Sequence, residues 1–139
     1  MPPEPDSPAN GLRVLLVDDD LFFSARILSV LKKLGYSAEA VRTVSDAEAK
    51  TREGQDLVIL NFGSPRLGGL ATVRALRAAG APRLLAFLSH VKIPAVREEV
   101  LAAGADKIVP NSAVSQRLPE ILTRILADEP LPQDIEVES

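Results

Sequence analysis

Short apolar runs alternate with segments of helical periodicity along most of this 139-residue chain. The run Leu12–Val17 predicts a buried strand, and apolar residues then recur at helical spacing until Gly35 ends the helix. Four more strands, each followed by a helix, are expected over residues 36–41, 56–60, 83–88 and 107–109. The form of Ser45–Glu48 is that of a capping box that opens the second helix.

Five strands that alternate with helices require a parallel sheet covered on both faces. We therefore predict an α/β fold, a flavodoxin-like three-layer sandwich with a parallel five-stranded sheet in the order 2-1-3-4-5. In such a fold, sites form at the carboxyl ends of the strands.

Proline and charge divide the chain into one domain, residues 11–127, and two ends. Residues 1–10 and 128–139 hold six of the eleven prolines, so we expect a disordered N-terminal extension and an acidic disordered tail. All 16 Lys and Arg lie within residues 11–127, together with 12 acids, so this part of the chain carries a net charge of +4. The two ends together carry −7, which gives the overall net charge of −3.

The composition also excludes several classes of protein. A chain without cysteine has no disulfide scaffold, Cys-ligated zinc or thiol nucleophile. Scattered basic residues differ from the dense stripe of a nucleic-acid binder, and no apolar run approaches the roughly 18 residues of a membrane span. We predict a cytoplasmic protein that acts on neither nucleic acid nor membrane.

Polar residues follow the predicted strands where the strands end. The first strand ends in Asp18, Asp19 and Asp20, and the third ends in Asn61. Carboxylates gathered at one strand end repel one another unless a cation or a helix N-terminus offsets their charge. The simpler alternative is that Asp20 caps the following helix and its neighbours are solvated.

Taken together, four segments resemble the receiver (CheY-like) domain of bacterial two-component response regulators. The resemblance covers residues 12–127. It rests on Val17–Asp20, on Asn61–Pro65 with Gly69, on Ser89, and on Gly104–Asp106 followed by Ile108–Asn111.

The resemblance implies roles for several of these residues. In the family, two acids hold Mg²⁺, an Asp after the third strand takes a phosphoryl group, a Ser or Thr contacts it, and a Lys completes the site. Asp18 and Asp19 match the acid pair and Ser89 matches the switch hydroxyl. Gly63 stands where the family uses a backbone carbonyl on the metal.

Three positions depart from the family pattern. Asn61 stands at the phosphoacceptor position, Asn111 at the Lys position, and Ile108 where the family usually has an aromatic switch residue. An amide has no anionic oxygen to attack phosphorus. Because an acid and a cation are lost together, the net charge of the site stays at −2, and such a paired replacement is often nearly neutral in stability.

The resemblance therefore implies a degenerate pseudo-receiver, stand-alone and not an enzyme, that signals by contact with a protein partner without phosphorylation. No cofactor is expected beyond weak Mg²⁺ at Asp18, Asp19 and Gly63. A conventional phosphorelay receiver is the alternative within the same fold.

An enzyme is the alternative from another class. The Asp-x-Asp in residues 18–20, with Ser89, matches the start of a haloacid-dehalogenase-like phosphatase, but that family's later acid pair is missing after the fifth strand. His90 beside Ser89 is interpreted as a surface-loop histidine, since no third member of a catalytic triad accompanies the pair. The segment after the first strand lacks the phosphate-binding loop of a flavodoxin.

A partner face is expected around the fourth and fifth helices. It would comprise Lys92, Arg97, Lys107 and Arg117, which otherwise form a solvated surface. The acidic residues 128–139 are expected to dock there transiently, or else to stay free. A homodimer is also compatible with the sequence.

Overall fold

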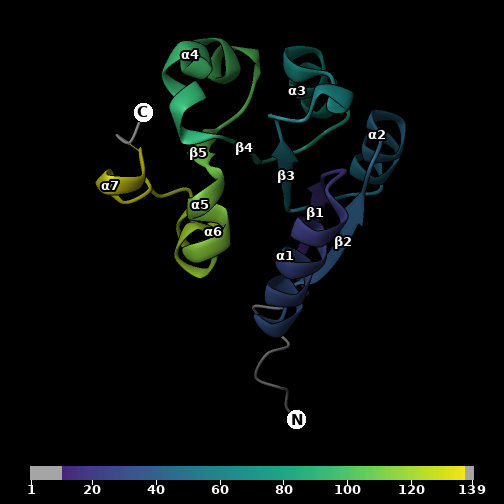
Figure 1. The fold of residues 1–139 in the computed structure, drawn as a ribbon. Coiled ribbons are helices and arrows are strands. Elements are labelled where there is room, and N and C mark those ends of the chain that lie inside the picture. Colours follow the sequence, from purple (N-terminus) through teal and green to yellow (C-terminus); the bar gives the residue numbers. More distant parts are fainter. Residues whose placement is uncertain (1–10, 137–139) are drawn as a thin grey trace.

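The computed structural model describes residues 11–136, which form one α/β sandwich around a parallel sheet (Figure 1). The five strands are β1 Arg13–Val17, β2 Ser37–Val41, β3 Leu57–Asn61, β4 Leu84–Leu88 and β5 Lys107–Pro110. They are hydrogen-bonded in the order β2-β1-β3-β4-β5, and every pair is parallel. The predicted fold class and strand order are confirmed.

Helices cover both faces of the sheet, with α1, α5 and α6 on one side and α2, α3 and α4 on the other (Figure 1). Their bounds are α1 Leu21–Lys33, α2 Val44–Arg52, α3 Gly69–Ala78, α4 Ile93–Ala103, α5 Asn111–Gln116, α6 Leu118–Leu126 and α7 Gln133–Glu136. Short 3-10 helices, η1 Pro65–Leu67 and η2 His90–Lys92, follow β3 and β4. None of the helices within residues 11–136 is long and apolar enough to cross a membrane.

Alternation along the strands creates two cores. In β1, Leu16 joins the cluster that contains Ile27 of α1, while Leu15 joins the cluster that contains Val73 of α3. Successive strand residues point to opposite faces, so a run without polar residues fills both layers. This packing fixes the carboxyl ends of β1 and β3 side by side, where the register pairs Val17 with Leu60.

The helices differ from those expected at two places. Thr43, in an extended conformation, caps α2 by accepting a 3.1 Å hydrogen bond from the N–H of Asp46, so the cap lies two residues before the predicted capping box at Ser45. The short helix α5 was not expected before the last helix, α6, and Arg117 leaves the helical conformation between the two. Pro119, in the first turn of α6, has no N–H to continue an earlier helix.

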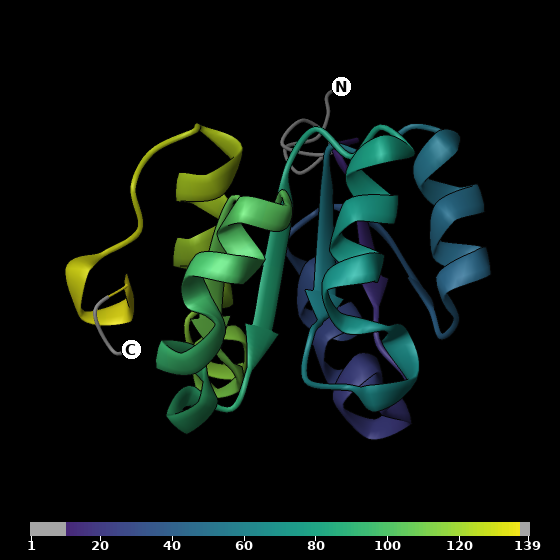
Figure 2. The same ribbon diagram turned by 90° about the horizontal axis from the view of Figure 1, so that it is seen from above.

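The largest correction concerns the segment after Ala127. Residues 128–136, called here the C-terminal strap, fold against the domain, so the predicted disorder is wrong for them; Figure 2 shows the chain turning back beyond α6 along the outside of the molecule. Leu131 and Ile135 are only 5% and 3% exposed, within the same cluster as Val109 of β5. Two apolar side chains four residues apart thus anchor a segment whose prolines and acids predicted disorder. Residues 1–10 and 137–139, predicted to be disordered, lie outside the described residues.

Candidate functional site

A buried carboxylate lies at the carboxyl end of β1. The side chain of Asp18 is 0% exposed, and its backbone N–H donates to the carbonyl of Val41 at 3.0 Å. Oδ1 of Asp18 accepts a 3.1 Å hydrogen bond from the N–H of Asp20, and Oδ2 accepts a 3.0 Å bond from the hydroxyl of Ser24. Hydrogen bonds to a buried charge compensate the hydration that the charge loses.

The amide of Asn61, at the end of β3, completes this arrangement. Nδ2 of Asn61 donates to Oδ1 of Asp18 at 2.8 Å, while Oδ1 of Asn61 accepts from the N–H of Gly63 at 3.1 Å. Reversing the amide would set oxygen against oxygen at Asp18 and N–H against N–H at Gly63. Its two neighbours therefore fix the orientation of the amide.

The other two acids of the triplet have separate roles. Asp19 is partly exposed, and its Oδ2 accepts a 2.9 Å hydrogen bond from the hydroxyl of the buried Ser64. Asp20 caps α1, because its carboxylate accepts a 3.0 Å bond from the N–H of Phe23. Capping therefore accounts for Asp20 alone, while Asp18 and Asp19 accept hydrogen bonds from Asn61 and Ser64.

The remaining predicted site residues stand apart from this hydrogen-bonded network. Ser89 is partly exposed between β4 and η2, and Asn111 is exposed as the first residue of α5. Ile108 is 2% exposed in the core on the α3 and α4 side of the sheet. Within residues 11–136, no hydrogen bond joins Ser89 or Asn111 to Asp18.

The carboxylate oxygens of Asp18 are not free to bind a divalent cation directly. Its Oδ1 already accepts two N–H groups and its Oδ2 a hydroxyl, and the amide of Asn61 presents the positive end of its dipole to the carboxylate. Mg²⁺ needs free oxygen ligands in octahedral geometry. Among the residues that the structure describes, no three or more His, Cys, Asp or Glu side chains are grouped to hold a metal ion.

Two residues of the network, Ser24 and Ser64, were not predicted. Ser24 lies three residues before Ile27 on the buried stripe of α1, and a hydroxyl in an apolar stripe signals a buried acceptor nearby. Ser64 precedes Pro65, and its hydroxyl also accepts from the N–H of Arg66 at 3.3 Å. A Ser-Pro turn typically uses its hydroxyl locally, which hides the contact with Asp19 from sequence reasoning.

The predicted partner face is partly occupied. Lys92 is exposed, whereas Arg97 and Lys107 are partly buried and have further interactions of their own. Arg117 donates to Glu120 at 2.7 Å and also pairs with Asp134 of the strap. The hydrogen bonds to Glu120 and then Asp134 raise the pKa of the Arg117 guanidinium above its usual value.

Comparison with known proteins agrees with this fold. The family model described as the response regulator receiver domain matches residues 14–123. The chain is 33% identical over 117 residues to the response regulator MprA of Mycobacterium leprae, an alignment that covers 84% of this chain and 50% of MprA. It is also 33% identical over 101 residues to the gliding motility regulatory protein of Myxococcus xanthus, 70% of this chain and 13% of that protein.

Solved structures give the same result. The receiver domain of a sensor histidine kinase from Pseudomonas aeruginosa, described with magnesium in its active-site cleft, superposes with a TM-score of 0.71 at 25% identity, covering 84% of this chain and 98% of that one. A response regulator from Hahella chejuensis gives a TM-score of 0.72 at 25% identity, covering 88% and 100%. The chain spans about half the length of its mycobacterial relatives.

Proposed function

Since this chain belongs to the family of response regulator receiver domains, we propose that it signals by contact with a protein partner, without phosphorylation at residue 61. The family places it in two-component signalling. More specifically, we propose that the residues at this site do not carry out phosphotransfer and instead form a fixed hydrogen-bonded network around Asp18 and Asn61.

The observation that carries the proposal is the 2.8 Å hydrogen bond from Nδ2 of Asn61 to Asp18. A phosphoacceptor needs an anionic oxygen free to attack phosphorus. At this position the chain has an amide whose nitrogen faces Asp18 and whose oxygen is bound by the N–H of Gly63. Neither atom is an anionic nucleophile, and both already form hydrogen bonds within the protein.

Two further positions support the same proposal. Asn111, where the family has Lys, carries no cation to stabilise a phosphoryl group. Position 108, where the family usually has an aromatic switch residue, holds an isoleucine that is buried in the core. This chain therefore has no aromatic side chain there that could rotate between the core and the surface. Acceptor, counter-cation and aromatic switch are thus replaced together.

We propose further that the domain is not an enzyme. In the phosphatase alternative Asp18 would be the nucleophile, but its carboxylate is 0% exposed and both of its oxygens accept hydrogen bonds. Asp20, the second acid of that motif, caps α1. A nucleophile must reach its substrate, so this burial argues against the phosphatase alternative.

Incubation with acetyl phosphate and Mg²⁺, followed by intact-protein mass spectrometry and peptide mapping, tests the proposal. The wild-type chain should gain no phosphoryl group in the peptide that contains residue 61. Its NMR spectrum should not change on adding beryllofluoride. The Asn61→Asp/Asn111→Lys variant is the matched control, because it restores both groups that the reaction requires.

Stoichiometric phosphorylation of the wild-type chain would contradict the proposal and favour a conventional phosphorelay receiver. Turnover of a phosphate ester that is lost in Asp18→Asn would favour the phosphatase instead.

A further inference from the structure

The C-terminal strap closes a groove beside β5, the edge strand of the sheet. β5 has a hydrogen-bonded neighbour on one side only, β4. On the other side the strap lies against it, outside α5 and α6 in Figure 1. Leu131 and Ile135 reach from the strap into the cluster that contains Val109 of β5 and Ala113 of α5. The strap thus covers apolar surface that is otherwise open at this edge.

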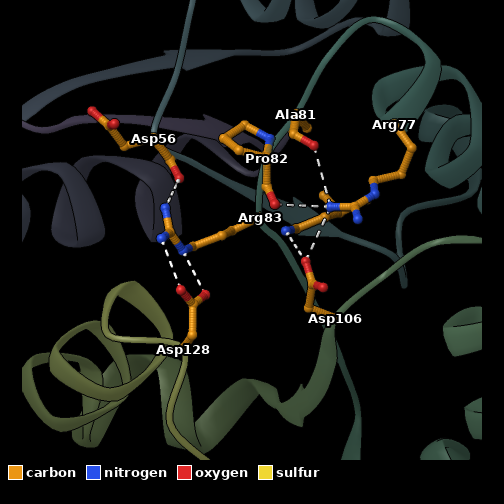
Figure 3. A network of polar contacts seen from close by, with 8 residues as sticks. Asp56, Arg77, Ala81, Pro82, Arg83, Asp106 and Asp128 are labelled. Carbon is orange, nitrogen blue, oxygen red and sulfur yellow. Dashed lines mark hydrogen bonds and ion pairs between the residues drawn. The ribbon is translucent and has the colours of Figure 1, made fainter.

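Arginines of the domain hold the strap at both ends. Arg83 binds the carboxylate of Asp128 with two hydrogen bonds, of 3.0 and 3.2 Å, and Figure 3 shows its guanidinium between Asp128 and the backbone carbonyl of Asp56. Arg117 pairs with Asp134 near the other end. The two carboxylates are 72% and 68% exposed, so salt screens both pairs.

The strap leaves cavities at both of its ends. A cavity of about 280 Å³ lies between the strap and α5, and its lining includes His90, Pro110, Arg117 and Ile135. A second cavity, of about 370 Å³, lies beside Arg83, Lys107 and Pro130. Both cavities open to solvent, so the site is not filled by the strap at either end.

We propose that the groove under the strap is a binding site for an acidic segment of a protein partner, and that the strap is its resident competitor. The inference rests on the proposed function in assuming a protein partner. The strap shows which chemistry the groove accepts: two aliphatic side chains four residues apart, as in Leu131 and Ile135, with carboxylates at Asp128 and Asp134.

Charge complementarity supports an acidic occupant. Three arginines contact the strap, since Arg124 also donates to the carbonyl of Pro130 at 3.1 Å. They face a segment with acids at positions 128, 129 and 134. Because the strap is tethered beside the groove, its local concentration is high. A partner therefore binds more weakly to the closed form: its apparent Kd is its intrinsic Kd divided by the fraction of molecules in which the strap is open.

A fluorescent peptide with the sequence of residues 127–139 is the probe, and its binding is measured by anisotropy on the full chain. In the Leu131→Ser/Ile135→Ser variant the resident strap loses both anchors, so the peptide should bind at least tenfold more tightly than to wild type. The same peptide with serine at both anchor positions should not bind. Leu21→Ser/Phe22→Ser, which changes exposed residues of α1, is the matched control and should behave as wild type.

Hydrogen exchange on the wild-type chain keeps the proposal testable if the double variant fails to fold. The amide of Ile135, which donates to the carbonyl of Pro132 at 3.0 Å, should exchange several-fold faster at 0.5 M salt than at low salt, while the amides of β1 and β3 stay unchanged. Two results would overturn the proposal. One is that the amide hydrogens of the strap exchange only together with those of the whole sheet. The other is that the peptide binds equally well to the wild type and to the folded variant.

A dimer that exchanges straps between copies would also overturn it, because the occupant would then be a second copy. Light scattering over a range of concentrations detects such a dimer. None of these measurements involves phosphorylation, so their failure leaves the role assigned to Asn61 intact, and the reverse also holds.

Discussion

Nδ2 of Asn61 lies 2.8 Å from Oδ1 of Asp18, across 43 residues of sequence, and donates a hydrogen bond to it. The donor is the last residue of β3 and the acceptor directly follows β1, and the carboxyl ends of these two adjacent strands meet at this edge. A neutral group with an N–H here stabilises a carboxylate that has lost its water. The same contact between two carboxylates would be repulsive.

Replacing Asn61 by Asp should therefore destabilise the fold at neutral pH. The new carboxylate would face the buried Asp18 without a donor between them, at a cost of about 3 kcal/mol of unfolding free energy. Urea unfolding measures it, and the loss should shrink in Mg²⁺, which offsets the added negative charge. Asn61→Ala is the control, with a loss of about 1–3 kcal/mol and little response to Mg²⁺. A loss in Asn61→Asp that Mg²⁺ leaves as unchanged as that in Asn61→Ala would mean that charge has no part in the effect.

Asn111→Lys should recover part of that loss when combined with Asn61→Asp. The added cation would lie at the carboxyl end of β5, the same edge of the sheet, and coupling between neighbouring groups is on the order of 0.5–3 kcal/mol. A double-mutant cycle of unfolding free energies measures it. Strict additivity would show that the pocket is not one electrostatic unit.

Truncating the anchors of the strap should cost stability although they follow the last long helix. Ile135→Ala removes a side chain that is 3% exposed and should lower the unfolding free energy by about 2 kcal/mol. Leu21→Ala, at a side chain that is 59% exposed, is the control and should stay within about 0.5 kcal/mol of wild type. Thermal unfolding followed by circular dichroism compares them, and identical midpoints would show that the strap adds nothing to the fold.

The strap should loosen in acid through Asp128. The hydrogen bonds from Arg83 lower the pKa of this carboxyl below its ordinary value of 3.8. A lowered pKa means that the stabilisation is present above about 3.8 and disappears as pH falls through the folded-state value. The methyl NMR signals of Leu131 and Ile135 should shift in that range in wild type. In Asp128→Asn the same range should show no such step, and an unchanged titration would assign the transition to another group.

The alternation of apolar runs and helical segments was enough to predict five parallel strands covered on both faces, and the order 2-1-3-4-5 was predicted as the simplest arrangement for a chain of this size. The grouping of Asp18, Asp19 and Asn61 followed from the same topology. Ser64 could not be assigned in advance, because a serine in a turn has local partners that compete with a distant carboxylate. Ser24 did give a signal, its place on the buried stripe of α1, but the sequence alone does not say which acceptor it meets. The strap was missed for a different reason. Its prolines and acids have the average composition of a disordered segment, but two apolar side chains, Leu131 and Ile135, are enough to pack it against the domain.

The order of elements along the chain has a consequence in time. The strap is joined to the domain after α6, so β5, α5 and α6 are synthesised before it. The edge strand β5 is therefore the last part of the sheet to be covered when the chain is made. A chain that stops before residue 128 would keep an uncovered edge strand beside open apolar surface, a combination that favours pairing with other chains and aggregation.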